Sequence, residues 1–206
     1  MKKSGGSKGA APAGGNNQLR IIGGRWRSRR FRFLDATGLR PTPDRVRETL
    51  FNWLQFEVPG AHCLDLFAGS GALSFEALSR GAASAVLIER DTRQAQCLRE
   101  TAAALEAEHC RVIGADSQQW LLKGLNDTRP ASGFDLVFLD PPFHLGLLAP
   151  ACLRLEEQGA LHDQSWVYLE TELGWAELAL PERFELYRDT RAGLVNSFLV
   201  RYHAPA

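Results

Sequence analysis

The segment CLDLFAGSG, residues 63–71, constrains the fold of this 206-residue chain more than any other. Its apolar first half predicts a buried strand over residues 63–67, the small residues after it predict a tight turn, and residues 71–80 continue with helical spacing. Glycines in such a turn permit positive φ and the close approach of a ligand, and the free N–H groups of the new helix point toward that ligand. The segment therefore predicts a binding site at the end of a strand.

Strand and helix patterns alternate through the rest of the chain. Further strands are predicted over residues 84–89, 110–116, 134–140, 166–170, 184–189 and 194–202, and helices over residues 91–105, 117–125 and 147–157. Apolar strands that alternate with helices are typical of a parallel sheet covered on both faces. We therefore expect a doubly wound, Rossmann-like α/β domain over residues 57–206, mostly parallel with an antiparallel C-terminal hairpin. Its ligand should lie beyond the carboxyl ends of the strands.

Acidic residues fall at the carboxyl ends of four successive predicted strands: Asp65, Glu89, Asp116 and Asp140. Such ends meet at one edge of a parallel sheet. Glu89 follows Gly69 by about 20 residues, the separation at which an acid after the second strand reaches the two hydroxyls of a ribose. The pattern predicts an adenosine-containing cofactor.

The motif Asp140-Pro141-Pro142-Phe143 follows the fourth of these strands directly. Prolines stiffen the turn and remove backbone donors, which leaves carbonyl acceptors. Asp140 and the Pro141 carbonyl can both accept hydrogen bonds from one NH₂ group, and Phe143 can stack on a flipped base. Because two such acceptors localise the lone pair of an exocyclic amine, we assign catalytic roles to Asp140, Pro141 and Phe143.

Charge is distributed unevenly along a chain whose formal net charge is zero. Residues 1–50 hold 12 Lys and Arg against 3 acidic residues, and the remaining 156 residues hold 12 against 21. Residues 1–18 are rich in glycine, serine, alanine and lysine, and predict a disordered tail. Residues 19–56 then predict a small basic extension made of a β-ribbon and a helix. A polyanion is the expected partner of this basic region.

The predicted ribbon has two short strands on either side of Gly23 and Gly24. In an ideal strand Arg25, Arg27 and Arg29 share one side. Arginine forks bind phosphates, and Trp26, Phe31 or Phe33 could stack on bases. The alternative is a solvated ribbon whose aromatic side chains merely pack on the body. The expected RNA-binding residues are Arg25, Arg27, Arg29, Arg30, Arg32, Arg40, Arg45 and Arg47.

The segment GLRPTPDRVRETLFNWL predicts the helix of the extension. Thr42 suits the N-cap, Pro43 the first helical position and Asp44 the positive end of the helix dipole. The apolar spacing predicts one face packed on the body and an opposite face that shows Arg45 and Arg47 beside the glycine turn.

Several classes of protein are disfavoured. The four cysteines form no CxxC pair and no HExxH motif accompanies them, so we expect reduced thiols and no metal site. No apolar run approaches the length of a membrane span, and the N-terminus lacks the apolar core of a signal peptide. We expect a cytoplasmic protein that does not contact membranes.

The motifs resemble those of the S-adenosylmethionine-dependent methyltransferases. Asp65, Phe67, Gly69 and Gly71 match the Asp-x-Phe-x-Gly-x-Gly loop of that class, and DPPF resembles its (Asn/Asp)-Pro-Pro-(Tyr/Phe) signature for methylation of planar nitrogens. The resemblance implies S-adenosyl-L-methionine as cofactor, with the loop around its methionine part, Glu89 on the ribose and Asp116 on the adenine amine. The implied cofactor-binding residues are Asp65, Phe67, Ala68, Gly69, Ser70, Gly71, Glu89, Arg90, Asp116, Ser117 and Asp140.

Together RPTPDRVRETLFNWL, CLDLFAGSGALSFEALSRGA and FDLVFLDPPF look like the bacterial family that methylates the N2 amine of one guanine, guanine 966, in 16S rRNA. The likeness runs over residues 19–202. It implies a monomer that acts on the small ribosomal subunit or a late assembly particle.

Other functions stay open on the residues alone. DPPF recognises an NH₂ group and no particular ring, so an adenine-N6 methyltransferase acting on DNA or RNA, or a protein glutamine methyltransferase, fits the same motif. An NAD-type oxidoreductase is disfavoured because Ser74 stands where the dinucleotide motif GxGxxG has its third glycine. A non-catalytic RNA-binding assembly factor with a vestigial pocket is the last alternative.

Overall fold

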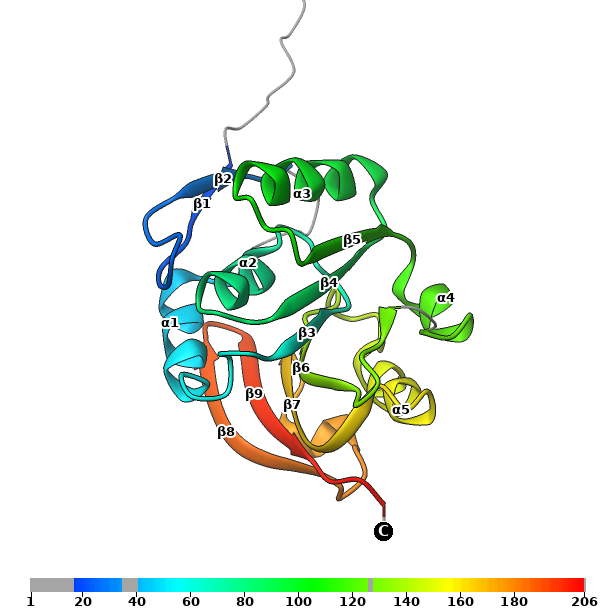
Figure 1. Ribbon diagram of the computed structural model, residues 1–206. Helices are drawn as coiled ribbons and strands as arrows, with labels where there is room; N and C mark the ends of the chain where they lie inside the picture. Colours follow the sequence, from blue (N-terminus) through cyan, green and yellow to red (C-terminus); the bar gives the residue numbers. More distant parts are fainter. Residues whose placement is uncertain (1–16, 35–40, 126–127, 206) are drawn as a thin grey trace, which may run out of the picture.

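The computed structural model describes residues 17–34, 41–125 and 128–205. A seven-stranded sheet forms its centre, in the order β5-β4-β3-β6-β7-β9-β8 (Figure 1). The strands are β3 (His62–Asp65), β4 (Ser84–Glu89), β5 (Cys110–Gly114), β6 (Phe134–Leu139), β7 (Leu161–Thr171), β8 (Phe184–Ala192) and β9 (Val195–Tyr202). The first five are parallel, and β9 is antiparallel to both β7 and β8. The predicted doubly wound sheet with its antiparallel hairpin is confirmed.

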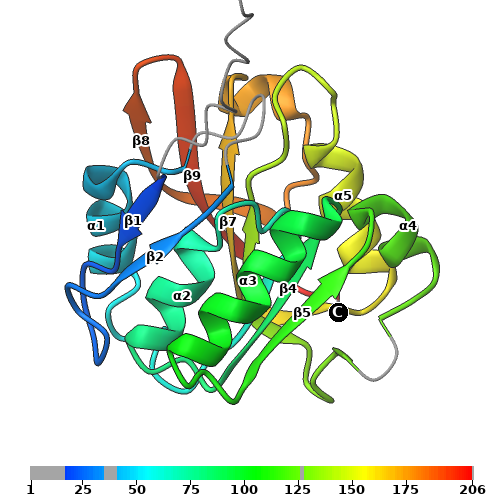
Figure 2. The same ribbon diagram turned by 90° about the horizontal axis from the view of Figure 1, so that it is seen from above.

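Helices cover both faces of the sheet (Figure 2). Side chains of α1 (Asp44–Trp53), α2 (Ala72–Ser79) and α3 (Thr92–Ala104) share one core cluster with the strands. Those of α4 (Ser117–Leu122) and α5 (Leu148–Glu157) share the other. Alternate residues of β3 divide between the two, with Cys63 in the first and Leu64 in the second, as expected for a strand buried on both sides.

Several strands end earlier than their apolar runs suggest. β3 ends at Asp65, so Leu66 and Phe67 already belong to the turn, and Asp116 and Asp140 lie in the loops after β5 and β6. β7 is longer than predicted, and a short helix, η2 (Trp175–Leu178), follows it. These shifts leave the order of the elements unchanged.

The N-terminal extension begins with the antiparallel pair β1 (Gln18–Arg20) and β2 (Arg30–Arg32). Gln18 is therefore in a strand, and the predicted tail, whose residues 1–16 lie outside the described residues, was placed too far along the chain. Residues 25–28 form a turn, so the expected alternation of Arg25, Arg27 and Arg29 along a strand is wrong.

The aromatic side chains of the extension face the body. Trp26, Phe31 and Phe33 are buried, and the ring of Phe31 packs edge-on against that of Phe75 in α2. The prediction that these rings could stack on bases is therefore wrong, and they pack on the body instead. The phosphate contacts of the arginines stay a prediction. Burying large apolar rings against α2 stabilises the attachment of the ribbon.

Helix α1 begins one residue later than predicted. Pro43 occupies the N-cap and provides no side-chain cap, while Asp44 lies in the first turn. Thr42, the expected N-cap, donates its hydroxyl hydrogen to Glu170 Oε1 at the end of β7, 2.7 Å away. The hydroxyl therefore joins the extension to the edge of the sheet where the strand ends meet.

Candidate cofactor and substrate site

The predicted acidic residues do lie along one edge of the sheet. Asp65 ends β3, whose neighbours are β4 and β6, and Glu89 ends β4 and pairs with Gly114 of β5. Asp116 and Asp140 follow β5 and β6 within two residues. The sheet order thus brings together residues that are up to 75 positions apart in the sequence.

The glycine turn has the backbone that its sequence predicts. Gly69 and Gly71 have positive φ, 49° and 76°, and Gly71 is the N-cap of α2. A Cβ atom on Gly71 would lie 2.6 Å from both Phe75 and Leu98. Only glycine fits here, for conformation and for space.

Asp65 lies beneath this turn and is buried. Its carboxylate accepts hydrogen bonds from the Ser74 hydroxyl, at 2.7 Å, and from the backbone N–H of Phe67. Burial raises its pKa to about 7, and these two hydrogen bonds oppose the rise. Ser74, which the sequence marks only as a missing third glycine, therefore stabilises the Asp65 carboxylate.

Glu89 is already tied to the turn. One carboxylate oxygen accepts from the Gly69 N–H at 2.8 Å and the other from the Asp91 N–H at 2.7 Å. Desolvation raises its pKa, and the two N–H groups work against that rise. The carboxylate is fixed in orientation and keeps lone pairs for a further donor. Arg90, the next residue, is exposed.

Gln94 is a buried residue of the site that the sequence analysis missed. Its Nε2 donates to the Gly69 carbonyl at 2.6 Å, and its Oε1 accepts from the Leu34 N–H at 2.9 Å. One side chain thus links the glycine turn to the N-terminal extension. The sequence signal that points to Gln94 is its position in the first turn of α3, three residues after the N-cap Asp91.

The residues after β5 fit an adenine ring. Asp116 is exposed and caps α4 through the Gln119 N–H, and Ser117 is buried. The Nε2 of Gln118 is buried and has no partner in the part of the chain that the structure describes. Adenine offers an amine donor and ring-nitrogen acceptors, which match the Asp116 carboxylate and the unused Gln118 amide.

Asp140 has a carboxylate whose oxygens are available to accept hydrogen bonds from a ligand. It is partly exposed, and no described residue donates a hydrogen bond to it. The residue keeps some exposed surface, but the surrounding protein desolvates its carboxyl group and raises its pKa well above the usual range, and the charges of Glu170 and Asp65 add to this effect. Three carboxyl groups at neighbouring strand ends therefore favour the arrival of a positive charge or a hydrogen-bond donor.

The DPPF turn borders a small cavity of about 100 Å³, lined by Pro141 and Pro142 on one side and Thr171 and Glu172 on the other. The backbone N–H of His144 donates to Glu172 Oε1 at 2.7 Å, which ties the turn to the end of β7. The His144 side chain is 82% exposed. Phe143 is partly exposed.

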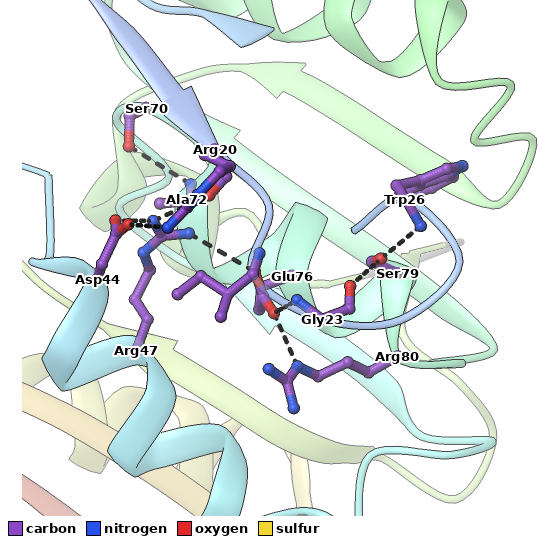
Figure 3. Close-up of polar contacts among 11 residues, drawn as sticks. Arg20, Gly23, Trp26, Asp44, Arg47, Ser70, Ala72, Glu76, Ser79 and Arg80 are labelled. Atoms are coloured by element: carbon purple, nitrogen blue, oxygen red, sulfur yellow. Dashed lines mark hydrogen bonds and ion pairs between the residues drawn. The ribbon is translucent and has the colours of Figure 1, made fainter. Parts of the chain in front are cut away.

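Arg47 corrects the predicted set of RNA-binding residues. Its side chain is 0% exposed, and its guanidinium pairs with Asp44, donates to the Arg20 carbonyl and lies 3.6 Å from Glu76 (Figure 3). A side chain enclosed in this way has no surface to offer a phosphate. Arg40 lies outside the described residues. The remaining predicted arginines are exposed: Arg25, Arg27, Arg29, Arg30, Arg32 and Arg45.

Glu76 and Ser79 of α2 hold the extension to the body (Figure 3). The buried Glu76 carboxylate accepts from the N–H groups of Ile22 and Gly23 and from Arg80 Nε, at 2.7 to 2.8 Å. The Ser79 hydroxyl donates to the Gly23 carbonyl and accepts from the Trp26 N–H. The helix that begins at the glycine turn is therefore also the anchor of the basic ribbon.

No group of three or more His, Cys, Asp or Glu in the described ranges is arranged to hold a metal ion. Within the same ranges, no helix has the length and apolar character that crossing a bilayer requires.

The sheet order, the glycine turn after β3 and the acids at the next strand ends define the fold of the S-adenosylmethionine-dependent methyltransferases. The family model described as Conserved hypothetical protein 95 matches residues 19–201. The chain belongs to this family.

Named relatives agree with this assignment. The chain is 45% identical over 181 residues to "Ribosomal RNA small subunit methyltransferase D" of Escherichia coli, with 88% of each chain covered. The protein of the same name from Haemophilus influenzae is 41% identical, with 87% and 91% covered. The solved structure of yhhF from Escherichia coli superposes with a TM-score of 0.82 at 43% identity, covering 92% of this chain and all of that one.

Proposed function

We propose that this protein is an S-adenosylmethionine-dependent methyltransferase that modifies the exocyclic N2 amine of a guanine in 16S rRNA of the small ribosomal subunit. The observation that carries the proposal is Asp140, a strand-end carboxylate that accepts no hydrogen bond from any residue the structure describes, followed by the Pro141 carbonyl. The RNA substrate comes from the names of relatives that are more than 40% identical to this chain over the aligned residues.

The cofactor would bind along the ends of β3, β4 and β5. The glycine turn Ala68–Gly71 lies where the methionine part would rest, Glu89 would accept from the ribose hydroxyls, and Asp116 with Ser117 and Gln118 would hold the adenine. Bound there, S-adenosylmethionine supplies the methyl group and a positive sulfonium charge, which offsets the repulsion among Asp65, Asp140 and Glu170.

The acceptors of the DPPF turn prepare the amine for transfer. The lone pair of an exocyclic amine is delocalised into the ring, which makes it a poor nucleophile. Asp140 and the Pro141 carbonyl, each accepting one amine hydrogen, favour the pyramidal form and hold the nitrogen in a fixed orientation. Phe143 would stack on the base after it leaves its helix or loop.

The exposed arginines of the extension would grip phosphates near the target. All of them except Arg45, which is in α1, lie on a ribbon that is anchored to α2, the helix that begins at the glycine turn. Phosphate contacts of this kind position the protein and carry no base specificity. The chosen base therefore depends on the strand-end residues.

Replacing Asp140 with Ala tests the proposal. Small-subunit particles that lack the modification are incubated with radiolabelled S-adenosylmethionine, and the RNA is digested to nucleosides. The wild type should yield labelled N2-methylguanosine, and D140A should be slower by a factor of about 10² to 10³ while it still binds the particles. D189A, which removes an exposed acid of β8, is the matched control.

Two results would contradict the proposal. Label in N6-methyladenosine would overturn the choice of base, and full activity of D140A would overturn the choice of site. If the inactive D140A variant had the same biological effect as the wild type, the alternative of a non-catalytic RNA-binding assembly factor would be favoured.

A further inference from the structure

Glu170 lies beside Asp140 at the edge of the sheet, and the sequence analysis gave it no role. Strands β6 and β7 are neighbours in the sheet (Figure 1). Leu139 of β6 pairs with Leu169 of β7, so the residue that follows each of them in the chain is one of these two acids. Adjacent strands are about 4.8 Å apart. The two carboxyl groups therefore lie next to each other at the same edge of the sheet.

The Glu170 side chain is 4% exposed and is held by two hydroxyl groups. Thr42 Oγ1 donates to its Oε1 at 2.7 Å, and the Tyr168 hydroxyl donates to the same atom at 2.9 Å. Within the described residues, no group donates a hydrogen bond to Oε2. This oxygen is also not one of the side-chain atoms that are fully enclosed and lack a partner, so it is not sealed off from a ligand. One oxygen is thus occupied and oriented, and the other keeps its full capacity to accept.

The two acids also interact electrostatically. The charge of Glu170 is, after burial, the largest contribution to the raised pKa of Asp140. The pKa of Glu170 is also raised by its burial, against the two hydroxyl donors. Like charges at this separation are costly unless donors come between them.

The Watson–Crick edge of guanine offers donors in that arrangement. Its N2 amine and its N1–H are neighbouring donors, whereas adenine presents an unprotonated N1, which is an acceptor. A base whose N2 amine reaches Asp140 and Pro141 places its N1 next to that amine. Recognition of guanine therefore needs a second acceptor, for the N1–H, next to the acceptors that hold the N2 amine.

We propose that Glu170 accepts the N1–H of the target guanine through Oε2 and so selects guanine over bases with an unprotonated N1. This inference rests on the proposed function, because it needs a base bound by its amine at Asp140. A purely structural role, in which Glu170 only holds Thr42 and the extension, makes a different prediction.

The variant E170Q separates the two roles. The hydroxyls of Thr42 and Tyr168 both donate to Oε1, so the glutamine carbonyl takes that place and its NH₂ group occupies the position of Oε2. The variant then presents a donor to the base. It should repel the N1–H of guanine and pair with the unprotonated N1 of 2-aminopurine, which keeps the 2-amino group.

The experiment uses small-subunit particles reconstituted with RNA that carries either guanine or 2-aminopurine at the modified position. Methyl transfer from S-adenosylmethionine gives kcat/KM for both. The wild type should prefer guanine by about 10- to 100-fold, and E170Q should lower that preference by a similar factor. E182Q, which removes an exposed acid from the loop before β8, should leave the preference unchanged.

The outcomes are distinct. A wild type that uses both bases equally overturns the inference without any variant, and so does an E170Q protein that loses activity on both in equal proportion. A wild type that methylates no guanine overturns the proposed function instead. A shifted preference in E170Q, with an unchanged one in E182Q, supports the assigned role.

Discussion

The strand-end site and the N-terminal extension differ in what determines the positions of their side chains. In the site, the residues singled out lie along one edge, from Asp65 to Asp140. In the extension, Trp26 and Arg47 were expected at the surface and both are buried. The difference teaches that position along a regular parallel strand fixes where a side chain lies, whereas the polarity of a side chain in a short ribbon or helix does not.

The two regions also differ in how they are held. The strands are held by backbone ladders, which any apolar run can form. The ribbon is held by side chains of α2, mainly Glu76 and Ser79, which contact residues more than 50 positions earlier in the chain. Contacts between such distant polar groups leave no local pattern.

The largest effect is expected from breaking this attachment. E76A leaves the N–H groups of Ile22 and Gly23 without their acceptor and removes the acid beside Arg47 and Arg80. Breaking a buried ion-pair network costs about 5 kcal/mol at the upper end of the known range. Urea denaturation should show a loss of this size, and limited proteolysis should cut the ribbon first.

E48A is the control for this variant, because Glu48 is an exposed acid of α1. Its free energy of unfolding should stay within about 0.5 kcal/mol of the wild type. Equal losses in E76A and E48A would show that α2 does not anchor the extension.

The burial of Asp65 in the strand-end site should make the free energy of unfolding depend on pH. The pKa of Asp65 is about 7 in the folded protein and 3.8 without burial. Between these values the folded state binds more protons than the unfolded state, so the free energy of unfolding falls as the pH rises from about 4 to 7. At 1.36 kcal/mol per pKa unit, the loss from Asp65 is about 4 kcal/mol.

D65N should remove this share of the pH dependence, since an asparagine oxygen still accepts from Ser74 and carries no charge to bury. The wild type should lose more stability than D65N between pH 4 and 8, measured by denaturation at each pH. D189N controls for net charge. If the free energy of unfolding depends on pH in the same way for the wild type and D65N, ionisation of Asp65 does not lower the stability of the protein.

The sequence predicted the fold class and most of the site because both depend on local patterns. Alternating apolar strands and helices indicated the sheet, and the glycines at 69 and 71 indicated the turn. Ser74, Gln94 and Glu170 were missed because each acts through a partner in another element. The strand pattern assumed over residues 25–28 was wrong because the chain turns there.

The smallest expected effect concerns the exposed side of the extension, where the predicted role in RNA binding stays a prediction. Arg30 and Arg32 flank the buried Phe31 in β2 and both point to solvent. If each contacts one phosphate, R30A and R32A should each lower the slope of log affinity against log salt by about 1, with little change in stability. R154A, on α5 across the sheet, should keep the wild-type slope. Slopes equal to that of the wild type in all three variants would mean that Arg30 and Arg32 do not contact phosphates, and the salt dependence would then have to come from the other exposed arginines.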